Sequence, residues 1–60
     1  MSQSMIDLVT HVVTRARSVG LDQQDQRDAA VAALMAAMPH ETPTIARFMV
    51  DLVLPTLAEA

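Results

Sequence analysis

Acid–base chemistry is the first possibility that the sequence raises, because a carboxylate and a histidine lie one helical turn apart near its start. Asp7 and His11 are four residues apart, and Arg15 follows after another four. An Asp–His pair would resemble part of a catalytic site if a nucleophile lay beside it. The chain has no Cys, and two of its three Ser residues stand at its very start. We therefore expect side-chain pairing on an exposed helix face, worth roughly 0.3 kcal/mol, and predict no catalytic residues.

Metal binding is the second possibility, raised by Asp22, Asp25 and Asp28 and by the neighbours His40 and Glu41. Calcium loops place oxygen ligands at alternating positions around a glycine turn, and no glycine interrupts the three aspartates. With two His and no Cys, a closed zinc site would need acidic ligands as well. The aspartates are typical of the start of a helix, where the helix dipole favours negative charge. We predict no metal site and no cofactor.

DNA binding is the third possibility. Ala16, Gly20 and Leu21 stand where a helix-turn-helix unit has a small residue, a turn glycine and an apolar residue. The next helix should then deliver basic or amide side chains to base edges. Its only cation is Arg27, three aspartates accompany it, and Gln26 stands where the motif has a buried aliphatic residue. A glycine-capped corner between two helices is the simpler interpretation, with a dimeric DNA-binding regulator as a second alternative.

The chain is too short to bury a large core by itself. It has 60 residues, 52% of them hydrophobic, and its only aromatic residue is Phe48. A domain of this size hides about 60% of its unfolded surface and usually needs a disulfide, a metal or a partner. Because Cys is absent, a partner chain is the supplement that we expect. The net charge of −3, with four Arg and no Lys, argues against nucleic acid or an anionic membrane as that partner.

No segment predicts membrane insertion or export. The start of the chain lacks the basic stretch of a secretory signal, and no run approaches the roughly 20 apolar residues that span a bilayer. We therefore expect a cytoplasmic protein without membrane contact. The lack of Lys and Asn beside abundant Ala and Val is typical of a GC-rich bacterial genome.

Four helix-breaking residues, Gly20, Pro39, Pro43 and Pro55, divide the chain. Apolar residues recur between them at helical spacing, and no alternating strand pattern is found. We predict an all-α fold in which one domain over residues 1–60 forms a small bundle of three short helices, at about 5–19, 22–38 and 43–54.

The first two predicted helices each have one apolar face. Ser4 and Asp22 are the expected N-caps, and Gly20 should take the left-handed conformation after the first helix. The apolar face of the first comprises Met5, Leu8, Val9, Val12, Ala16 and Val19. The core face of the second comprises Val31, Leu34, Met35 and Met38. Its alanine face is expected to meet solvent, with close helix contact as the alternative: Ala29, Ala32, Ala33, Ala36 and Ala37.

The third predicted helix is apolar on almost every side. Thr42 is its expected N-cap, and Pro43 fits the first helical position, where a missing N–H costs nothing. The side that we expect to face the core holds Ile45, Phe48, Met49, Leu52 and Val53. The other side also carries apolar residues, Val50 and Leu54, with Leu57 nearby. A helix of this kind is normally buried, and two neighbouring helices cannot cover all of it.

A second copy of the chain is the expected cover for this helix, because closed two-fold dimers are the commonest soluble assemblies. We predict a homodimer or higher oligomer whose interface comprises Phe48, Val50, Val53, Leu54 and Leu57. The predicted function is that of a non-enzymatic interaction module or regulator. The alternative is an accessory subunit that docks the same helix on a larger partner protein, since both associations use the same physics.

Overall fold

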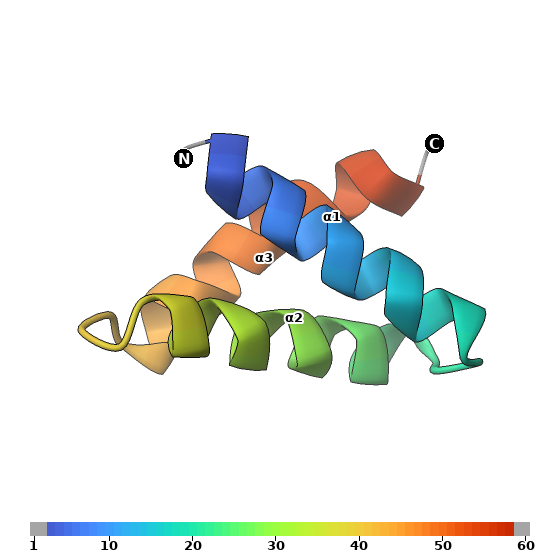
Figure 1. Ribbon diagram of the computed structural model, residues 1–60, viewed down its shortest axis with the longest axis horizontal. Coiled ribbons are helices and arrows are strands. Elements are labelled where there is room, and N and C mark those ends of the chain that lie inside the picture. Colours follow the sequence, from blue (N-terminus) through green and yellow to red (C-terminus); the bar gives the residue numbers. More distant parts are fainter. Residues whose placement is uncertain (1–2, 59–60) are drawn as a thin grey trace.

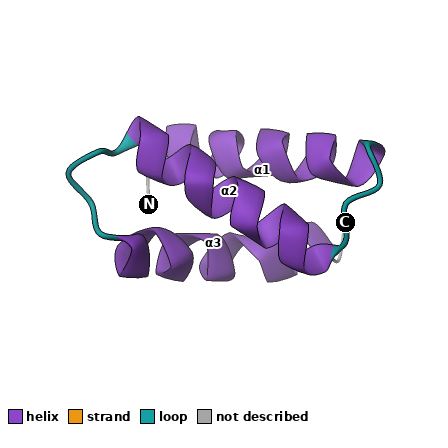
Figure 2. Cartoon of the chain, turned by 90° about the horizontal axis from the view of Figure 1, so that it is seen from below, coloured by secondary structure: helices purple, strands orange, loops and turns teal. Residues whose placement is uncertain are grey.

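Three α-helices make up the structure. The computed structural model describes residues 3–58, with the backbone alone for 57 and 58, and contains no strand in that range. The helices are α1 (Gln3–Ser18), α2 (Gln23–Ala37) and α3 (Pro43–Ala58), which confirms the predicted all-α fold. α2 lies across α1 and α3 (Figure 2). α1 and α2 make the most extensive contact, and α3 packs more on α2 than on α1. The start of α1 and the end of α3 lie on the side away from α2 (Figure 1).

The corner between α1 and α2 is fixed by backbone chemistry that the sequence predicted. Gly20 has a φ of 86°, a left-handed conformation that costs other residues more. The N–H of Gly20 donates to the carbonyl of Arg17, and that of Leu21 donates to Ala16, each at 3.0 Å. These two bonds form a Schellman motif and satisfy carbonyls at the end of α1. Asp22 then caps α2 by accepting a bond of 2.8 Å from the N–H of Asp25.

The start of α3 also follows the prediction. The hydroxyl of Thr42 accepts a hydrogen bond of 3.3 Å from the N–H of Ile45. The carbonyl of Thr42 accepts the first helical bond, from Ala46, at 3.1 Å. Pro43 occupies the first position of the helix, where its ring holds the backbone angle φ at a value that suits a helix.

Two predicted helix boundaries are wrong. α1 begins at Gln3, so Ser4 lies inside the helix and is not its N-cap. α3 does not end at residue 54 but continues through Pro55 to Ala58. A proline inside a helix removes the N–H that would bond to the carbonyl four residues earlier, here Asp51. Since Val53 is buried and Leu54 packs against the core, tertiary contacts hold the chain helical up to the proline and oppose that cost.

The core is built from alanine and valine side chains of all three helices and one leucine of α2. Its members are Val9, Val13, Ala30, Val31, Leu34, Ala46, Val50 and Val53. Ala30 and Ala46 are fully buried, so α2 and α3 approach their neighbours closely at these positions. Val13, absent from the predicted face of α1, is fully buried, whereas Val19 is 67% exposed because it follows the last residue of α1.

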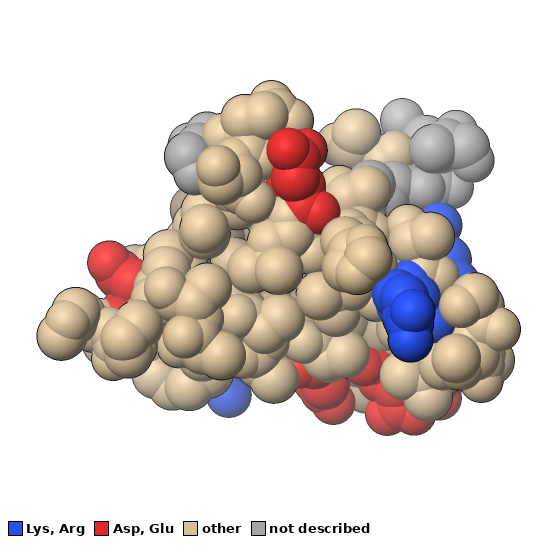
Figure 3. All heavy atoms as spheres, viewed as in Figure 1, with Lys and Arg blue, Asp and Glu red and all other residues tan. Residues whose placement is uncertain are grey.

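On α2 the predicted core face is confirmed at Val31 and Leu34, which are buried, while Met35 is 36% exposed. The alanine side is mixed. Ala29 and Ala33 are half-buried, and the other three expected on that side are exposed: Ala32, Ala36 and Ala37. The face of the molecule in Figure 3 is largely uncharged, with acidic atoms near the top, at the left edge and along the bottom, and basic atoms mainly at the right.

The side of α3 that faces the core was predicted only in part. Val53 is 8% exposed and Met49 packs against the core, as predicted. Val50, predicted to lie on the other side, is fully buried, and so is Ala46. The other residues predicted to face the core are exposed by 43%, 62% and 58%: Ile45, Phe48 and Leu52. Because both sides of α3 are apolar, the packing of the three helices decides which residues are buried, and the alanine and valines of α3 join the valines of α1 and α2 in the core.

The burial of these residues bears on the predicted interface. Val50 and Val53 are covered by the folding of one chain and are closed to a second copy. Leu54 is half-buried and packs against the core. Phe48 is exposed, and the side chain of Leu57 lies outside the described residues.

The difference in burial between two adjacent residues of α2 yields a test of this core. Leu34→Ala should lower the free energy of unfolding by about 2–5 kcal/mol, since it leaves a cavity at a fully buried position. Met35→Ala, at a partly exposed position, should cost about 1 kcal/mol or less. Urea unfolding followed by circular dichroism measures both. Equal losses for the two variants would contradict the packing described here.

Candidate functional site

An uncharged apolar stripe on α3 is the clearest surface feature. It comprises Ile45, Phe48 and Leu52, which we call the α3 stripe, and all three are among the exposed large hydrophobic residues. Their spacing of three and then four residues puts them on one face of the helix, within about 60° at 100° per residue. Monomeric proteins expose single apolar residues routinely, but a contiguous row on one face is typical of a contact surface.

A bidentate ion pair joins α2 to α3. Arg27 Nε lies 2.8 Å from Asp51 Oδ1, and Arg27 Nη2 lies 3.1 Å from Asp51 Oδ2. The hydrogen bond from Arg27 lowers the pKa of Asp51, and the same bond from Asp51 raises the pKa of Arg27. The pair neutralises Asp51, three residues after Phe48 in the middle of the α3 stripe, and joins α3 to α2.

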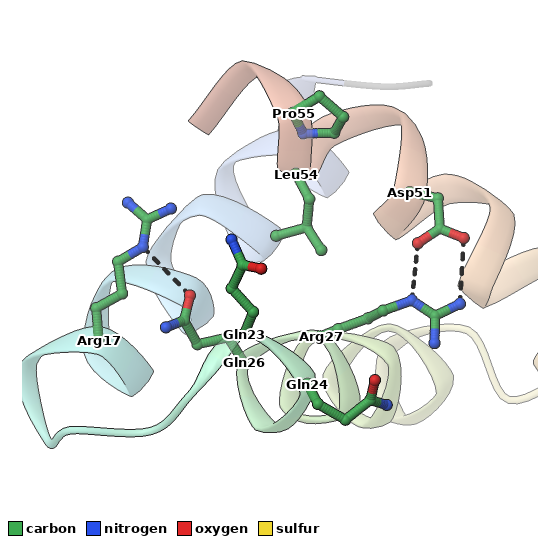
Figure 4. A pocket seen from close by; sticks show the side chains of 8 residues that line it. All are labelled: Arg17, Gln23, Gln24, Gln26, Arg27, Asp51, Leu54 and Pro55. Atoms are coloured by element: carbon green, nitrogen blue, oxygen red, sulfur yellow. Dashed lines mark hydrogen bonds and ion pairs between the residues drawn. The ribbon is translucent and has the colours of Figure 1, made fainter. Parts of the chain in front are cut away.

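A hollow of about 500 Å³ lies between the start of α2 and the last turns of α3. We call it the α2–α3 hollow, and it is drawn in Figure 4. Its lining is Arg17, Gln23, Gln24, Gln26, Arg27, Asp51, Leu54 and Pro55. The ion pair of Arg27 and Asp51 forms one wall, while Gln23 and Leu54 point into the space between the two arginines (Figure 4). Its size is that of a small-molecule site.

Gln26 is a buried polar residue of α2, at the position where a helix-turn-helix unit would have an aliphatic side chain. It is only 9% exposed. Its Nε2 donates to the carbonyl of Leu21 at 2.8 Å, and its Oε1 accepts from Arg17 Nε at 3.2 Å. Burial of an amide is tolerated when both ends are bonded. The available signal was its spacing from Ala30 and Leu34, one and two helical turns later on the same face.

A second hollow, of about 350 Å³, is shallow and lies at the α1–α2 corner, with Val19, Leu21 and Ala29 in its lining. His11 and Arg15 stand at this hollow and are exposed. The expected pairing of Asp7 with His11 is replaced by a bond from Gln3 Nε2 to Asp7 Oδ1, of 2.9 Å. The residues of the predicted Asp–His pair are therefore separate surface groups.

The three aspartates of α2 have structural partners. Asp22 is the N-cap, and the N–H of Asp25 is bonded to it. Asp28 Oδ1 accepts from Gln24 Nε2 at 3.1 Å. His40 and Glu41 are exposed in the turn between α2 and α3. Within residues 3–58, no three side chains of His, Cys, Asp or Glu come together as a metal site would require.

Comparisons with known proteins add no family to this description. No family model matches the chain, and neither a curated protein nor a solved structure does. Of the helices described, none has the length and apolar character to cross a bilayer. The α3 stripe and the α2–α3 hollow are therefore the candidate functional surfaces.

The ion pair predicts how stability depends on pH. In the folded chain the pKa of Asp51 lies below its ordinary value of 3.8. The ion pair therefore stabilises the fold at any pH above the pKa that Asp51 has in the unfolded chain. This stabilisation is lost as the pH falls through the pKa that Asp51 has in the folded chain. Asp51→Asn should therefore reduce the fall in Tm between about pH 5 and pH 2, and should lower Tm at pH 7 by only a few degrees because the pair is exposed. Glu41→Gln makes the same charge change outside the pair. An acid transition of equal size in parent and Asp51→Asn would refute this assignment.

Proposed function

We propose that the chain is a non-enzymatic interaction module that acts as a homodimer through the α3 stripe. The observation that carries this proposal is the exposure of Ile45, Phe48 and Leu52 on one helix face. Exposed aromatic and large aliphatic side chains at helical spacing are the anchors by which helices bind one another. The partner is a second copy, for reasons of symmetry, charge and size.

Symmetry favours a second copy because the stripe is self-complementary. Ile45 and Leu52 flank Phe48 on either side along α3. Two antiparallel copies of α3 related by a two-fold axis would bring the Phe48 rings together near the axis. Each Ile45 would then meet the partner's Leu52. An isologous contact of this kind closes after two copies and leaves no further apolar row.

Charge also favours a like surface. The stripe contains no ionisable side chain, and the nearest acidic group on its flank, Asp51, is held by Arg27. A strongly charged partner would form no ion pair with such a face. A second copy brings the same uncharged stripe, so the contact buries no charge. The repulsion between two chains of net charge −3 acts between exposed groups and is screened at physiological salt.

The total surface sets the strength of association. The chain exposes 3983 Å², close to the roughly 3,800 Å² expected for a folded monomer of this mass. One copy is therefore as compact as an ordinary folded protein of its mass. Burying the exposed parts of only six large side chains favours association weakly, because it must offset the freedom that two chains lose on binding. We expect a monomer–dimer equilibrium between micromolar and millimolar concentration.

Removal of the central anchor tests the proposal. Phe48→Asp should weaken dimerisation about thirtyfold or more, the effect of losing a central aromatic anchor. The helix content should be unchanged, because Phe48 is 62% exposed in the single chain. Sedimentation equilibrium from micromolar to millimolar concentration measures the Kd, and circular dichroism checks the fold.

Thr14→Asp is the matched control, since it adds the same charge at an exposed position of α1 and should leave the Kd unchanged. A parent chain that stays monomeric at millimolar concentration would refute self-association. A Phe48→Asp chain that dimerises like the parent would show that another surface is used.

A further inference from the structure

The α2–α3 hollow combines a positioned cation with an apolar wall. Arg17 comes from the end of α1, Gln23 and Gln26 from the start of α2, and Leu54 and Pro55 from the end of α3. Three separate helices thus converge on one space of about 500 Å³. The hollow lies beside the α3 stripe and does not contain any of its residues.

Arg17 is held in place by a chain of hydrogen bonds. The carbonyl of Leu21, at the glycine corner, accepts from the amide of Gln26, and the other end of that amide accepts from Arg17 Nε at 3.2 Å. Gln26 is nine-tenths buried, so this connection is anchored in the fold. The bond uses Nε alone, and within residues 3–58 no carboxylate forms an ion pair with Arg17. Besides Nε, the guanidinium has two terminal nitrogens as further donors, and the bond at Nε restricts the positions that this exposed side chain adopts, which lowers the entropic cost of binding.

The charge balance of the hollow indicates which ligand it fits. Its lining holds two arginines and one aspartate, and Arg27 and Asp51 neutralise each other. One positive charge is left, that of Arg17, in a chain of net charge −3. A ligand with a single negative charge matches this one cation, whereas a doubly charged phosphate would keep one charge uncompensated in the hollow. The planar fork of an arginine fits a carboxylate through two parallel bonds.

We propose that the α2–α3 hollow binds a small monocarboxylate with an apolar body. The carboxylate accepts hydrogen bonds from the terminal nitrogens of Arg17. The apolar part lies against Leu54 and Pro55, and the amide of Gln23 supplies a further hydrogen bond at the mouth. The site is independent of dimerisation, because the monomer contains all of its residues.

Titration with hexanoate tests this site in the intact chain. The expected result is a saturable change in the ¹⁵N–¹H signals of Arg17 Nε and the start of α2, with a Kd on the order of millimolar for so small a ligand. Arg17→Gln should weaken binding about tenfold, the loss of a charge-assisted hydrogen bond. Arg15→Gln removes the same charge two residues away, outside the hollow, and should leave binding unchanged. The neutral analogue hexanol should bind about tenfold more weakly than hexanoate.

A second variant guards against an effect of Arg17→Gln on the fold. Gln23→Glu places a competing carboxylate in the hollow at an exposed position in the first turn of α2, where negative charge favours the helix. It should keep the parent's Tm and lose hexanoate binding, whereas Thr14→Glu should bind like the parent. The proposal is overturned if the two arginine variants weaken binding equally, if hexanol competes as well as hexanoate, or if inorganic phosphate binds more tightly. It is also overturned if no saturable change is seen.

Discussion

The close approach of the three helices at two alanines is the constraint on which the rest of the structure depends. Ala30 of α2 and Ala46 of α3 are fully buried, and the space left around them accepts valine and one leucine from the neighbouring helices. The only aromatic residue of the chain, Phe48, stands outside this core, at 62% exposure. The large apolar surface of α3 is a consequence of how its smaller residues pack.

Polar contacts at the rim of this core decide where the remaining surfaces lie. The bidentate pair between Arg27 and Asp51 joins α3 to α2. The side chain of Gln26 bonds to the carbonyl of Leu21 at the glycine corner and to Arg17 at the end of α1. It thereby joins the end of α1 to the start of α2. These contacts leave the α3 stripe uncharged and separate it from the α2–α3 hollow. One small chain can thus carry an association surface and a pocket side by side.

Several local features of the fold could be predicted from the sequence. Gly20, Asp22, Thr42 and Pro43 act through the backbone nearest to them, so their roles at the helix ends were predicted correctly. The end of α3 was not, because tertiary contacts outweigh the local effect of Pro55. The core side of α3 was predicted only in part because both of its faces are apolar, and periodicity does not say which one meets the other helices. The same limit applies to the candidate site. The sequence predicts that α3 has an apolar face without a partner in the single chain. Which residues form that face, and that Gln26 is buried, depends on how the three helices pack.

The central claim is that α3 turns Ala46, Val50 and Val53 toward the core, while Ile45, Phe48 and Leu52 face outward. Methyl NMR with a soluble paramagnetic agent measures this most directly, in a dilute sample where the single chain predominates. The account predicts strong broadening of the Ile45 and Leu52 methyl signals and little broadening for Val50 and Val13, as their exposures require. Protection of Ile45 and Leu52 should then appear as the concentration rises. Broadening of Val50 with protection of Leu52 in the dilute sample would contradict the account.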